Sequence, residues 1–329
     1  MGERSLLPVK IFFFCIIILL SIVFFTGCMT NTVKSNTSDI IQTSKTPQSI
    51  TTQSPVYTAI SAGGGHNLAL RQDGTVLAWG DVSHKEIIEV PENLKDIVSI
   101  SAGDQYSLAM KRDGTIFFWG RPDPSDQIPT LTNVSKTVDI TALSSGCGHV
   151  LALKKDGTVI TRGTNRVGAL DPPANLTNVI AISAGCYHSL ALKADGTVVG
   201  WGAQEGRYVA YGQAYVPSNL TDVIAISAGL QHSLALKKDG TIVAWGGNEN
   251  GQTDVPTTLT DVIAISAGAR HNLALKKDGT VIAWGQNNFN QSHVPEGLRD
   301  VKAISAGGAS SLALKKDGTI VAWGAVGNP

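Results

Sequence analysis

The triplet Asp-Gly-Thr occurs seven times along this 329-residue chain, at nearly constant spacing. The copies lie 39 to 44 residues apart and begin at Asp73, Asp113, Asp156, Asp195, Asp239, Asp278 and Asp317. A fixed period of about forty residues indicates an array of one supersecondary unit, which buries its apolar face only by stacking against its neighbours. The repeat therefore constrains the architecture more than any other feature of the chain.

Each repeat contains three strand-like runs, which in the sixth copy are Val262–Ala267, His271–Lys277 and Thr280–Gly285. Asp-Gly between two alternating apolar runs predicts a β-hairpin, and the favoured two-residue type I′ turn needs positive φ at both central residues. The first run is rich in β-branched residues, as strands are. We therefore expect a three-stranded antiparallel meander from each repeat.

Side-chain size orders the three strands from a central axis outward. The first strand ends in Ser-Ala-Gly in six copies, and the third ends in Trp-Gly in six copies. Sheets arranged radially crowd at the axis and diverge at the rim, as in a β-propeller. Small residues at the axis and indoles at the rim thus predict an all-β fold, a seven-bladed β-propeller over residues 56–329 with mainly three-stranded antiparallel blades. The ring would close by packing blade seven against blade one, or by Ile50–Gln53 adding an outer strand to blade seven.

The first 28 residues have the features of a bacterial lipoprotein signal peptide. Arg4 and Lys10 are followed by a run of fifteen residues, Ile11 to Phe25, that is apolar except for Ser21, and then by Thr26-Gly27-Cys28. Phe25 to Cys28 resembles a lipobox, which predicts lipidation of Cys28. The alternative is an uncleaved signal anchor, but a span needs about twenty apolar residues. Residues 29–55 are rich in Ser, Thr, Gln and Asn, the composition of a disordered tether. We expect a lipid-anchored protein on the extracytoplasmic face of a bacterial membrane.

The charge balance argues against a nucleic-acid partner. Lys plus Arg and Asp plus Glu each number 26, so the chain lacks the basic footprint of a nucleic-acid binder. Lysines precede several Asp-Gly turns and would form a ring on one face, offset by Asp222, Asp261 and Asp300 at the starts of first strands. A solvated face is expected there rather than an anion site.

Two cysteines occupy the same corner, between the first and second strands, in adjacent repeats. Cys147 stands two residues before His149, and Cys186 two before His188. Three states are open: unpaired buried thiols, a disulfide if the Cα atoms lie within about 7 Å, or a zinc site, since Cys₂His₂ is a common ligand set. Histidine also recurs at this corner as His66, His232 and His271, which favours a structural role for it. The same role is expected for Tyr106, which replaces it in the second repeat. No cofactor is expected.

The corners and the loops after Trp-Gly are expected on one face of the propeller, and the Asp-Gly turns on the other. The fourth repeat carries five extra residues in its loop. That loop includes Arg207, Tyr208, Tyr211 and Tyr215, a composition typical of interface hot spots. Tyr187 and Phe289 would extend this candidate partner-binding surface. The alternative is that these rings only pack the loop.

The phrase Ser-Ala-Gly-Xaa-Xaa-His-Ser-Leu-Ala-Leu-Lys-Xaa-Asp-Gly-Thr-Val-Xaa-Ala-Trp-Gly resembles the repeat of the regulator of chromosome condensation family, over Val56 to Gly324. The short period is similar to the bacterial branch that includes propellers of the β-lactamase inhibitory protein II type. This resemblance implies a seven-bladed propeller that grips an enzyme through aromatic residues before the corner histidine and in the loop after Trp-Gly. Among the corresponding corner positions only Tyr187 is aromatic here, and in the loops Phe289 matches the aromatic pattern whereas Glu249-Asn250 does not. The guanine-nucleotide exchange of the eukaryotic branch does not suit an exported chain.

We therefore expect a monomeric, non-catalytic interaction module that docks a protein partner or a cell-wall ligand. A β-lactamase inhibitor is one alternative, and a carbohydrate-active enzyme or cell-wall binder is another. Catalysis would require an acid, base or nucleophile set apart from the repeats and within hydrogen-bond reach of a second such group. The polar residues peculiar to single repeats are instead scattered over separate loops: His84, Glu86, Asp171, Glu205 and His293.

Overall fold

The structure, a computed structural model, describes residues 55–81, 83–121, 139–165, 167–203 and 210–325. These residues belong to one compact unit that begins at Pro55. The predicted signal peptide with Cys28, the predicted tether up to Ser54, and Ile50–Gln53 lie outside the described residues, as do Arg207 and Tyr208.

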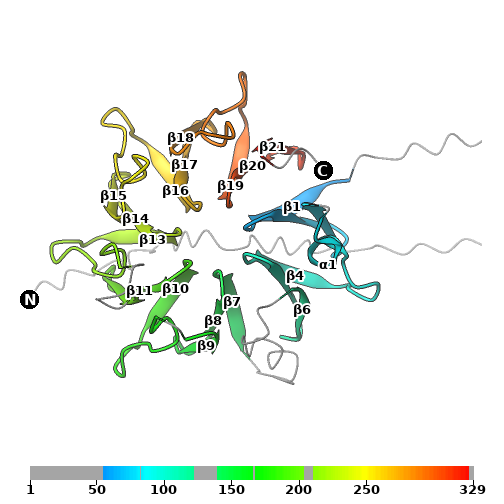
Figure 1. Ribbon diagram of the computed structural model, residues 1–329, viewed down its shortest axis with the longest axis horizontal. Helices are drawn as coiled ribbons and strands as arrows, with labels where there is room; N and C mark the ends of the chain where they lie inside the picture. The colour runs from blue at the N-terminus through cyan, green and yellow to red at the C-terminus, as the bar shows by residue number, and fades with distance from the viewer. Residues whose placement is uncertain (1–54, 82, 122–138, 166, 204–209, 326–329) are drawn as a thin grey trace, which may run out of the picture. The chain divides into compact units, whose positions relative to one another are not determined.

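Seven three-stranded antiparallel sheets surround a central axis, one for each repeat (Figure 1). The all-β fold, the seven blades and the three-stranded meander predicted from the sequence are confirmed. The blades in chain order are β1 (Tyr57–Ala62), β2 (His66–Arg71) and β3 (Val76–Gly80); β4 (Ile97–Ala102), β5 (Tyr106–Lys111) and β6 (Ile116–Gly120); β7 (Ile140–Ser145), β8 (His149–Lys154) and β9 (Val159–Gly163); β10 (Val179–Ala184), β11 (His188–Lys193) and β12 (Val198–Gly202); β13 (Val223–Ala228), β14 (His232–Lys237) and β15 (Ile242–Gly246); β16 (Val262–Ala267), β17 (His271–Lys276) and β18 (Val281–Gly285); and β19 (Val301–Ala306), β20 (Ser310–Lys315) and β21 (Ile320–Gly324).

One short helix, α1 (Lys85–Ile88), lies in the first connector, which joins blade one to blade two. Ile87 is its buried residue and is 2% exposed. Within the described ranges, no helix has the length and apolar character needed to cross a bilayer.

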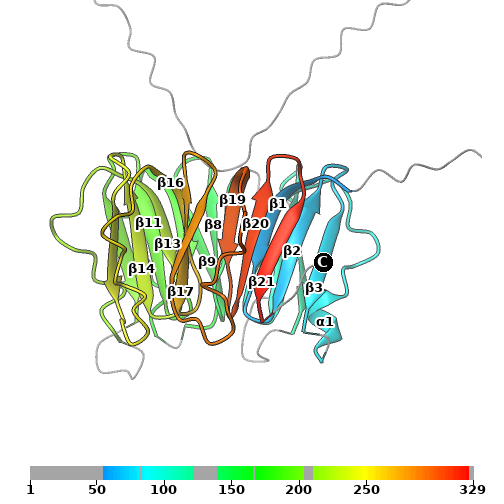
Figure 2. The same cartoon turned by 90° about the horizontal axis from the view of Figure 1, so that it is seen from above.

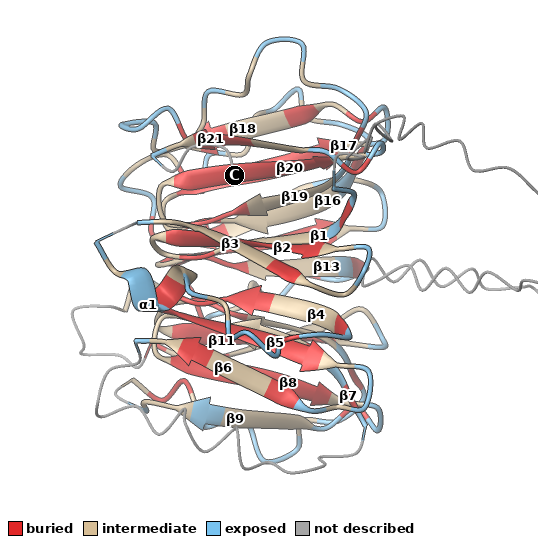
Figure 3. Ribbon diagram, turned by 90° about the vertical axis from the view of Figure 1, so that its right-hand side faces the viewer, coloured by how far each residue is buried: buried red, intermediate tan, exposed pale blue. Residues whose placement is uncertain are grey.

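Burial follows the order of the strands in each blade. The middle strands are buried from their first to their fifth residue, because neighbouring blades cover both of their faces (Figure 3). The inner strands carry Ser-Ala-Gly to the axis, and the outer strands carry the tryptophans toward the rim (Figure 1). Five of the six indoles are 6–8% exposed. The expected taper, with small residues at the axis and broad ones outside, is present.

The Asp-Gly-Thr segments form the expected hairpins, but the predicted turn type is wrong. In the first blade, Gly74 N–H donates to the Arg71 carbonyl and Arg71 N–H to the Thr75 carbonyl. Gly74 has φ +80°, whereas Asp73 is not among the residues with positive φ. This is a three-residue loop with a single left-handed residue, a common alternative to type I′. The Asp carboxylate instead accepts hydrogen bonds from Thr75 N–H and the Thr75 hydroxyl.

The hydrophobic core is divided into seven clusters, one at each interface between blades. At the interface of blades four and five, Leu190 and Leu192 of the middle strand β11 pack against Val223, Ala235 and Trp245 of the next blade. All five side chains are at most 8% exposed. Each blade therefore completes its core only by contact with its neighbours, as the repeat predicts.

The interface of blades two and three differs from the others because Arg162 stands where other repeats have tryptophan. Arg162 is exposed, and its guanidinium donates to the Thr161 carbonyl. On the opposing blade, Tyr106 replaces the corner histidine and stacks on Phe118 with ring centroids 5.4 Å apart. Both aromatic rings pack in the cluster with Val150. Two large residues from blade two thus supply the volume that blade three lacks.

The ring closes by side-by-side packing of blade seven and blade one. Leu314 packs against Tyr57 and Ala69 in their shared cluster. Tyr57 N–H donates to the Gly318 carbonyl at 3.0 Å, and Gly308 N–H donates to the Gly63 carbonyl at 2.9 Å. Of the two modes of closure considered from the sequence, packing of the end blades is present. All residues that make these contacts belong to the strands and turns of blades one and seven.

Candidate binding face

The corners and the loops after Trp-Gly lie on the same side of every blade. Each outer strand ends in a glycine, and the residue that follows it donates its N–H to a carbonyl in the corner of the same blade, at 2.7–2.9 Å. These donors are Asp81, Arg121, Thr164, Ala203, Gly247, Gln286 and Ala325. We call this side the corner face and the opposite side the turn face; in Figure 2 they lie at the bottom and the top of the propeller. The two-sided arrangement expected from strand direction is confirmed.

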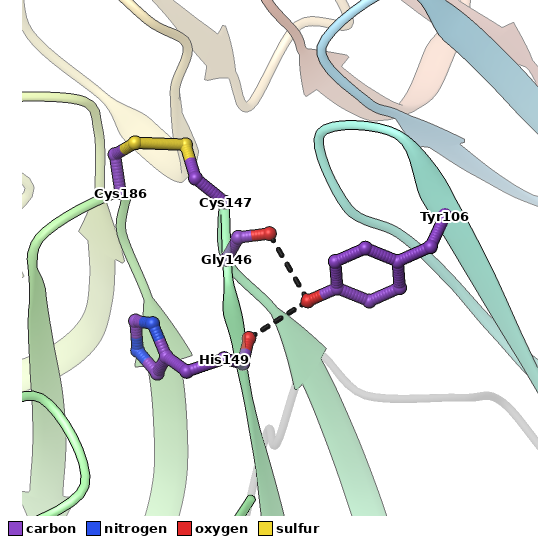
Figure 4. Close-up of a disulfide and its surroundings, with 5 residues drawn as sticks. All are labelled: Tyr106, Gly146, Cys147, His149 and Cys186. Atoms are coloured by element: carbon purple, nitrogen blue, oxygen red, sulfur yellow. Dashed lines mark hydrogen bonds between the residues drawn. A yellow bond between two sulfur atoms is a disulfide. The ribbon is translucent and has the colours of Figure 1, made fainter. Parts of the chain in front are cut away.

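The corner histidines link each blade to the next. Five imidazoles form hydrogen bonds of 2.7–2.9 Å through Nε2 to the second residue of the following middle strand, and the pairs are His66–Ser107, His149–Ser189, His188–Ser233, His232–Asn272 and His271–Ser311. The Tyr106 hydroxyl donates to the Gly146 and His149 carbonyls (Figure 4), and the Ser310 hydroxyl donates to Asn67 Oδ1. Seven links therefore complete the circle, and the structural role expected of these residues is confirmed.

Burial keeps these histidines neutral. Desolvation lowers the pKa of His66, His149, His232 and His271 from 6.5 to about 4, and that of His188 to about 3. All five residues are at most 1% exposed. A base that is buried, neutral and bonded to the next blade is scaffold, because it can neither reach a substrate nor change charge near neutral pH.

A second closed circle of hydrogen bonds joins the inner strands. In each blade, the first serine of the Ser-Ala-Gly segment, or of Ser-Ser-Gly in blade three, accepts a backbone N–H from the next blade. The donor is the residue that follows the equivalent serine there, at 2.9–3.0 Å. The accepting serines are Ser61, Ser101, Ser144, Ser183, Ser227, Ser266 and Ser305. The bond from Ala62 N–H to Ser305 joins the two ends of the array. The recurrence of Ser-Ala-Gly thus serves the ring itself.

Cys147 and Cys186 form a disulfide between the corners of blades three and four (Figure 4). Their Cα atoms lie 4.5 Å apart although 39 residues separate them in sequence. Of the three states left open by the sequence, the disulfide is present. The zinc alternative is wrong, because both sulfur atoms are bonded to each other and the Nε2 atoms of His149 and His188 are bonded to serines.

The lysines of the turn face pair with the carboxylates of their own turns. Five Lys–Asp pairs have N–O distances of 3.1–3.9 Å: Lys154–Asp156, Lys193–Asp195, Lys237–Asp239, Lys276–Asp278 and Lys315–Asp317. Asp222, Asp261 and Asp300 lie at the same end of the blades, but these lysines form their ion pairs with the turn aspartates. Asp222, Asp261 and Asp300 instead adopt φ of 58–59°, and their carbonyls accept N–H groups from the adjacent turns. Exposed pairs of this kind contribute little to stability.

Three buried glutamines in the connectors were missed from the sequence. Gln213, Gln252 and Gln291 are 0% exposed, and each side-chain oxygen accepts the N–H of the residue two positions earlier. Their carbonyls accept the indole N–H of the next blade's tryptophan. The available signal was spacing, because Gln252 and Gln291 follow their tryptophans by seven residues, while Gln213 follows after twelve, owing to the five-residue insertion.

The described aromatic candidates lie on the corner face, in blade four and in two connectors. Tyr187 is half-buried in the corner of blade four. Tyr211 and Tyr215, in the connector to blade five, are 36% and 55% exposed. Phe289 is 56% exposed and occupies the position equivalent to Tyr211 two connectors later, with Asn250 in the connector between them. Tyr187 therefore lies beside Ala203, at the start of the fourth connector, and Phe289 lies two connectors farther along the chain.

The polar residues that are peculiar to single repeats stay in separate connectors. His84 Nδ1 lies 3.0 Å from Asp81 Oδ2 on the exposed surface, where Asp81 also accepts from Ser83. Asp171 accepts hydrogen bonds from the Asn165 amide. Both groups stabilise the connector in which they lie. Across the described ranges, three or more His, Cys, Asp or Glu side chains do not gather into a metal-binding group.

A cavity of about 140 Å³ lies where the seven corners meet at the axis. Its walls are alanine and glycine residues from all seven blades, with the disulfide on one side. Three larger or polar residues interrupt the small ones: Asp104, Ser145 and Leu230. The corner face thus presents an axial cavity inside a ring of connectors.

Comparison with known proteins agrees with this geometry. Residues 57–84, 179–208, 223–252 and 262–291 match the profile of the regulator of chromosome condensation (RCC1) repeat. These four segments are RCC1 repeats. A search of curated proteins by sequence finds no match.

Solved structures with the same architecture confirm the fold. Prp20p of Saccharomyces cerevisiae, studied for binding to Gsp1p and histones, is 19% identical over 78% of this chain and 82% of its own, with a TM-score of 0.63. The ectodomain of the Physcomitrella patens receptor kinase CR4 is 21% identical over 84% and 74%, with a TM-score of 0.64. The CRINKLY ectodomain of the Arabidopsis thaliana receptor kinase ACR4 is 19% identical over 82% and 98%, with a TM-score of 0.63. RCC1-like propellers are common protein-binding scaffolds.

Reduction of the disulfide is expected to lower the free energy of unfolding by about 2–4 kcal/mol, because the cross-link restricts the unfolded chain. Urea unfolding with and without a reductant measures the loss. The Cys147→Ser, Cys186→Ser double variant is the control and should unfold at one urea concentration in both conditions. An unchanged midpoint for the reduced wild-type protein would contradict this account.

Proposed function

We propose that this protein is a non-catalytic interaction module, lipid-anchored through Cys28 outside the cytoplasm, that docks a protein partner on its corner face. The observation that carries the proposal is the exposure of aromatic rings there, chiefly Tyr211, Tyr215 and Phe289. Aromatic residues are enriched in protein interfaces and dominate their binding energy. The proposed surface also includes Arg207 and Tyr208 of the insertion, and Tyr187 at its base.

The rigidity of the scaffold supports a docking role. Buried glutamines hold the connectors that carry exposed rings, because the Gln213 side chain accepts the Tyr211 N–H and the Gln291 side chain accepts the Phe289 N–H. Backbone that is already ordered loses little further freedom when a partner binds. The recurrent histidines support the absence of catalysis, since each is committed to an inter-blade hydrogen bond.

The described chain enters the propeller on the face that does not carry the exposed rings. Val56 lies on the turn face, where its carbonyl accepts Gln72 N–H and the adjacent Tyr57 N–H donates to the Gly318 carbonyl. The described chain therefore enters the propeller on the turn face, and the exposed rings lie on the opposite, corner face.

Replacing Tyr211, Tyr215 and Phe289 together by Ala is expected to reduce recovery of the partner at least about tenfold, since truncating aromatic anchors costs 2 kcal/mol or more at hot spots. The measurement is crosslinking capture from an envelope fraction with the Pro55–Pro329 unit, read by quantitative mass spectrometry. The matched control replaces Ile180, Ile224 and Ile263 by Ala, because these residues are 37–50% exposed at the turn-face ends of inner strands. Equal recovery by both variants would refute the surface.

Lipidation is expected at Cys28 alone. Cells that express the full chain and are fed an alkyne fatty acid should label the wild-type protein and lose the label with Cys28→Ala. Cys15→Ala is the matched control, because Cys15 lies in the segment that processing would remove. A label that persists in Cys28→Ala would contradict the proposed anchor.

β-Lactamase inhibition is a second candidate for the same face. Tyr187 and Phe289 occupy positions where the resemblance to the β-lactamase inhibitory protein II type puts enzyme-gripping rings, and Phe289 is exposed. Steady-state hydrolysis of a chromogenic β-lactam, with and without excess propeller, tests it directly. The partners of Prp20p are not carried over, because 19% identity shows the fold alone.

A further inference from the structure

One charged side chain lies in the axial cavity. The second corner position carries Asp104 in blade two, whereas the other blades have Gly64, Cys147, Cys186, Leu230, Ala269 and Gly308 there. Among the described residues, no cation lies within ion-pair distance of the Asp104 carboxylate, and no side-chain or backbone group donates a hydrogen bond to it. Among the described residues, water alone therefore solvates this carboxylate in its wall of alanine and glycine.

The surrounding structure accommodates this carboxylate closely. A Cβ atom at Gly64 would lie 1.9 Å from Asp104 Oδ1, although the backbone at Gly64 does not adopt the left-handed conformation that requires glycine. The absence of a side chain at residue 64 thus makes room for the carboxylate. Asp104 is exposed at the mouth, yet the walls remove enough hydration to raise its pKa. An opposite charge brought into the cavity would relieve that cost.

We propose that the axial cavity binds the ammonium group of a lysine side chain that the protein partner inserts from the corner face, with Asp104 as the counter-ion. This inference rests on the proposed docking function and adds the chemistry of one contact. Asp104 would accept a charge-assisted hydrogen bond from Nζ. The alanine and glycine walls would contact the methylene groups of the stem.

The size of the cavity and its single carboxylate suit this occupant. Its volume of about 140 Å³ is smaller than the roughly 300–1,000 Å³ of sites for whole small molecules. A lysine presents a compact charge on a flexible four-carbon stem, whereas the planar fork of arginine suits bidentate partners. Ser145 also lines the cavity, and its hydroxyl donates to the Ser101 carbonyl at 3.4 Å, so the lone pairs of that hydroxyl are not used by this bond.

The test uses n-butylammonium chloride as the probe of a lysine side chain, titrated into the ¹⁵N-labelled Pro55–Pro329 unit and followed by NMR. We expect saturable shifts confined to the amides of Gly64, Asp104 and Cys147, with a dissociation constant on the order of millimolar for so small a ligand. Asp104→Asn should weaken binding about tenfold or more, as loss of a charged hydrogen-bond partner does. The control Glu249→Gln removes an exposed charge from a connector and should bind as the wild type does.

Each outcome decides the proposal. Shifts that are equally strong with sodium chloride or n-butanol, or that persist in Asp104→Asn, would overturn it, as would the absence of saturable shifts. Gly64→Ala, which displaces the carboxylate, should reproduce the loss. The variant lacking Tyr211, Tyr215 and Phe289 should bind the probe normally. Failure of amine binding therefore refutes only the lysine site, and failure of partner capture only the docking surface.

Discussion

The hydrogen bonds that pass from each blade to the next are the interaction on which the rest of this structure depends. A three-stranded sheet with a fully apolar middle strand cannot remain folded alone, and its neighbours must cover it on both sides. Apolar packing supplies most of that cover but sets no register. Corner bonds and serine-to-backbone bonds are directional, and both kinds occur at every interface. The corner bond joins an imidazole to a serine at four interfaces, and His232–Asn272, Tyr106 with two carbonyls, and Ser310–Asn67 replace it at the other three. They fix the angle between blades and therefore the number of blades that close the ring.

This constraint explains where function can reside. The residues that look chemically most interesting in the sequence, the recurring histidines and the turn aspartates, are used by the scaffold. What remains for binding is whatever differs between repeats at the corner face: the tyrosines of the fourth connector, Phe289, and Asp104 at the axis. The turn face is nearly uniform, because its Asp-Gly-Thr segments bond within their own turns. Variation on a fixed ring is how propellers acquire partners.

The sequence predicted the blades, their order and the two faces correctly, because these depend on period and side-chain size. It did not predict the turn type, because a single left-handed glycine after Asp73 satisfies the hairpin as well as two left-handed residues do. It left the Cys147–Cys186 pairing open, because a separation of 39 residues does not give the distance between two corners. That distance depends on the curvature of the ring, which brings the two Cα atoms to 4.5 Å. The glutamines were missed because their side chains bond backbone N–H groups of their own connectors, a role that their residue type does not announce. Asp104 was missed because the unusual feature is its surroundings rather than its type.

The dependence of stability on pH tests the central claim most directly. Unfolded histidines bind protons near pH 6.5, whereas folded His188 does so only near pH 3 and the other four near pH 4. Between those limits the unfolded chain holds more protons, so the free energy of unfolding must fall as the pH is lowered from about 6.5 toward 4. Each buried histidine contributes a slope of up to about 1.4 kcal/mol per pH unit. Urea unfolding of the wild type and of His188→Gln between pH 7 and pH 4.5 should show a steep fall that is shallower in the variant, and equal or flat profiles would contradict the account.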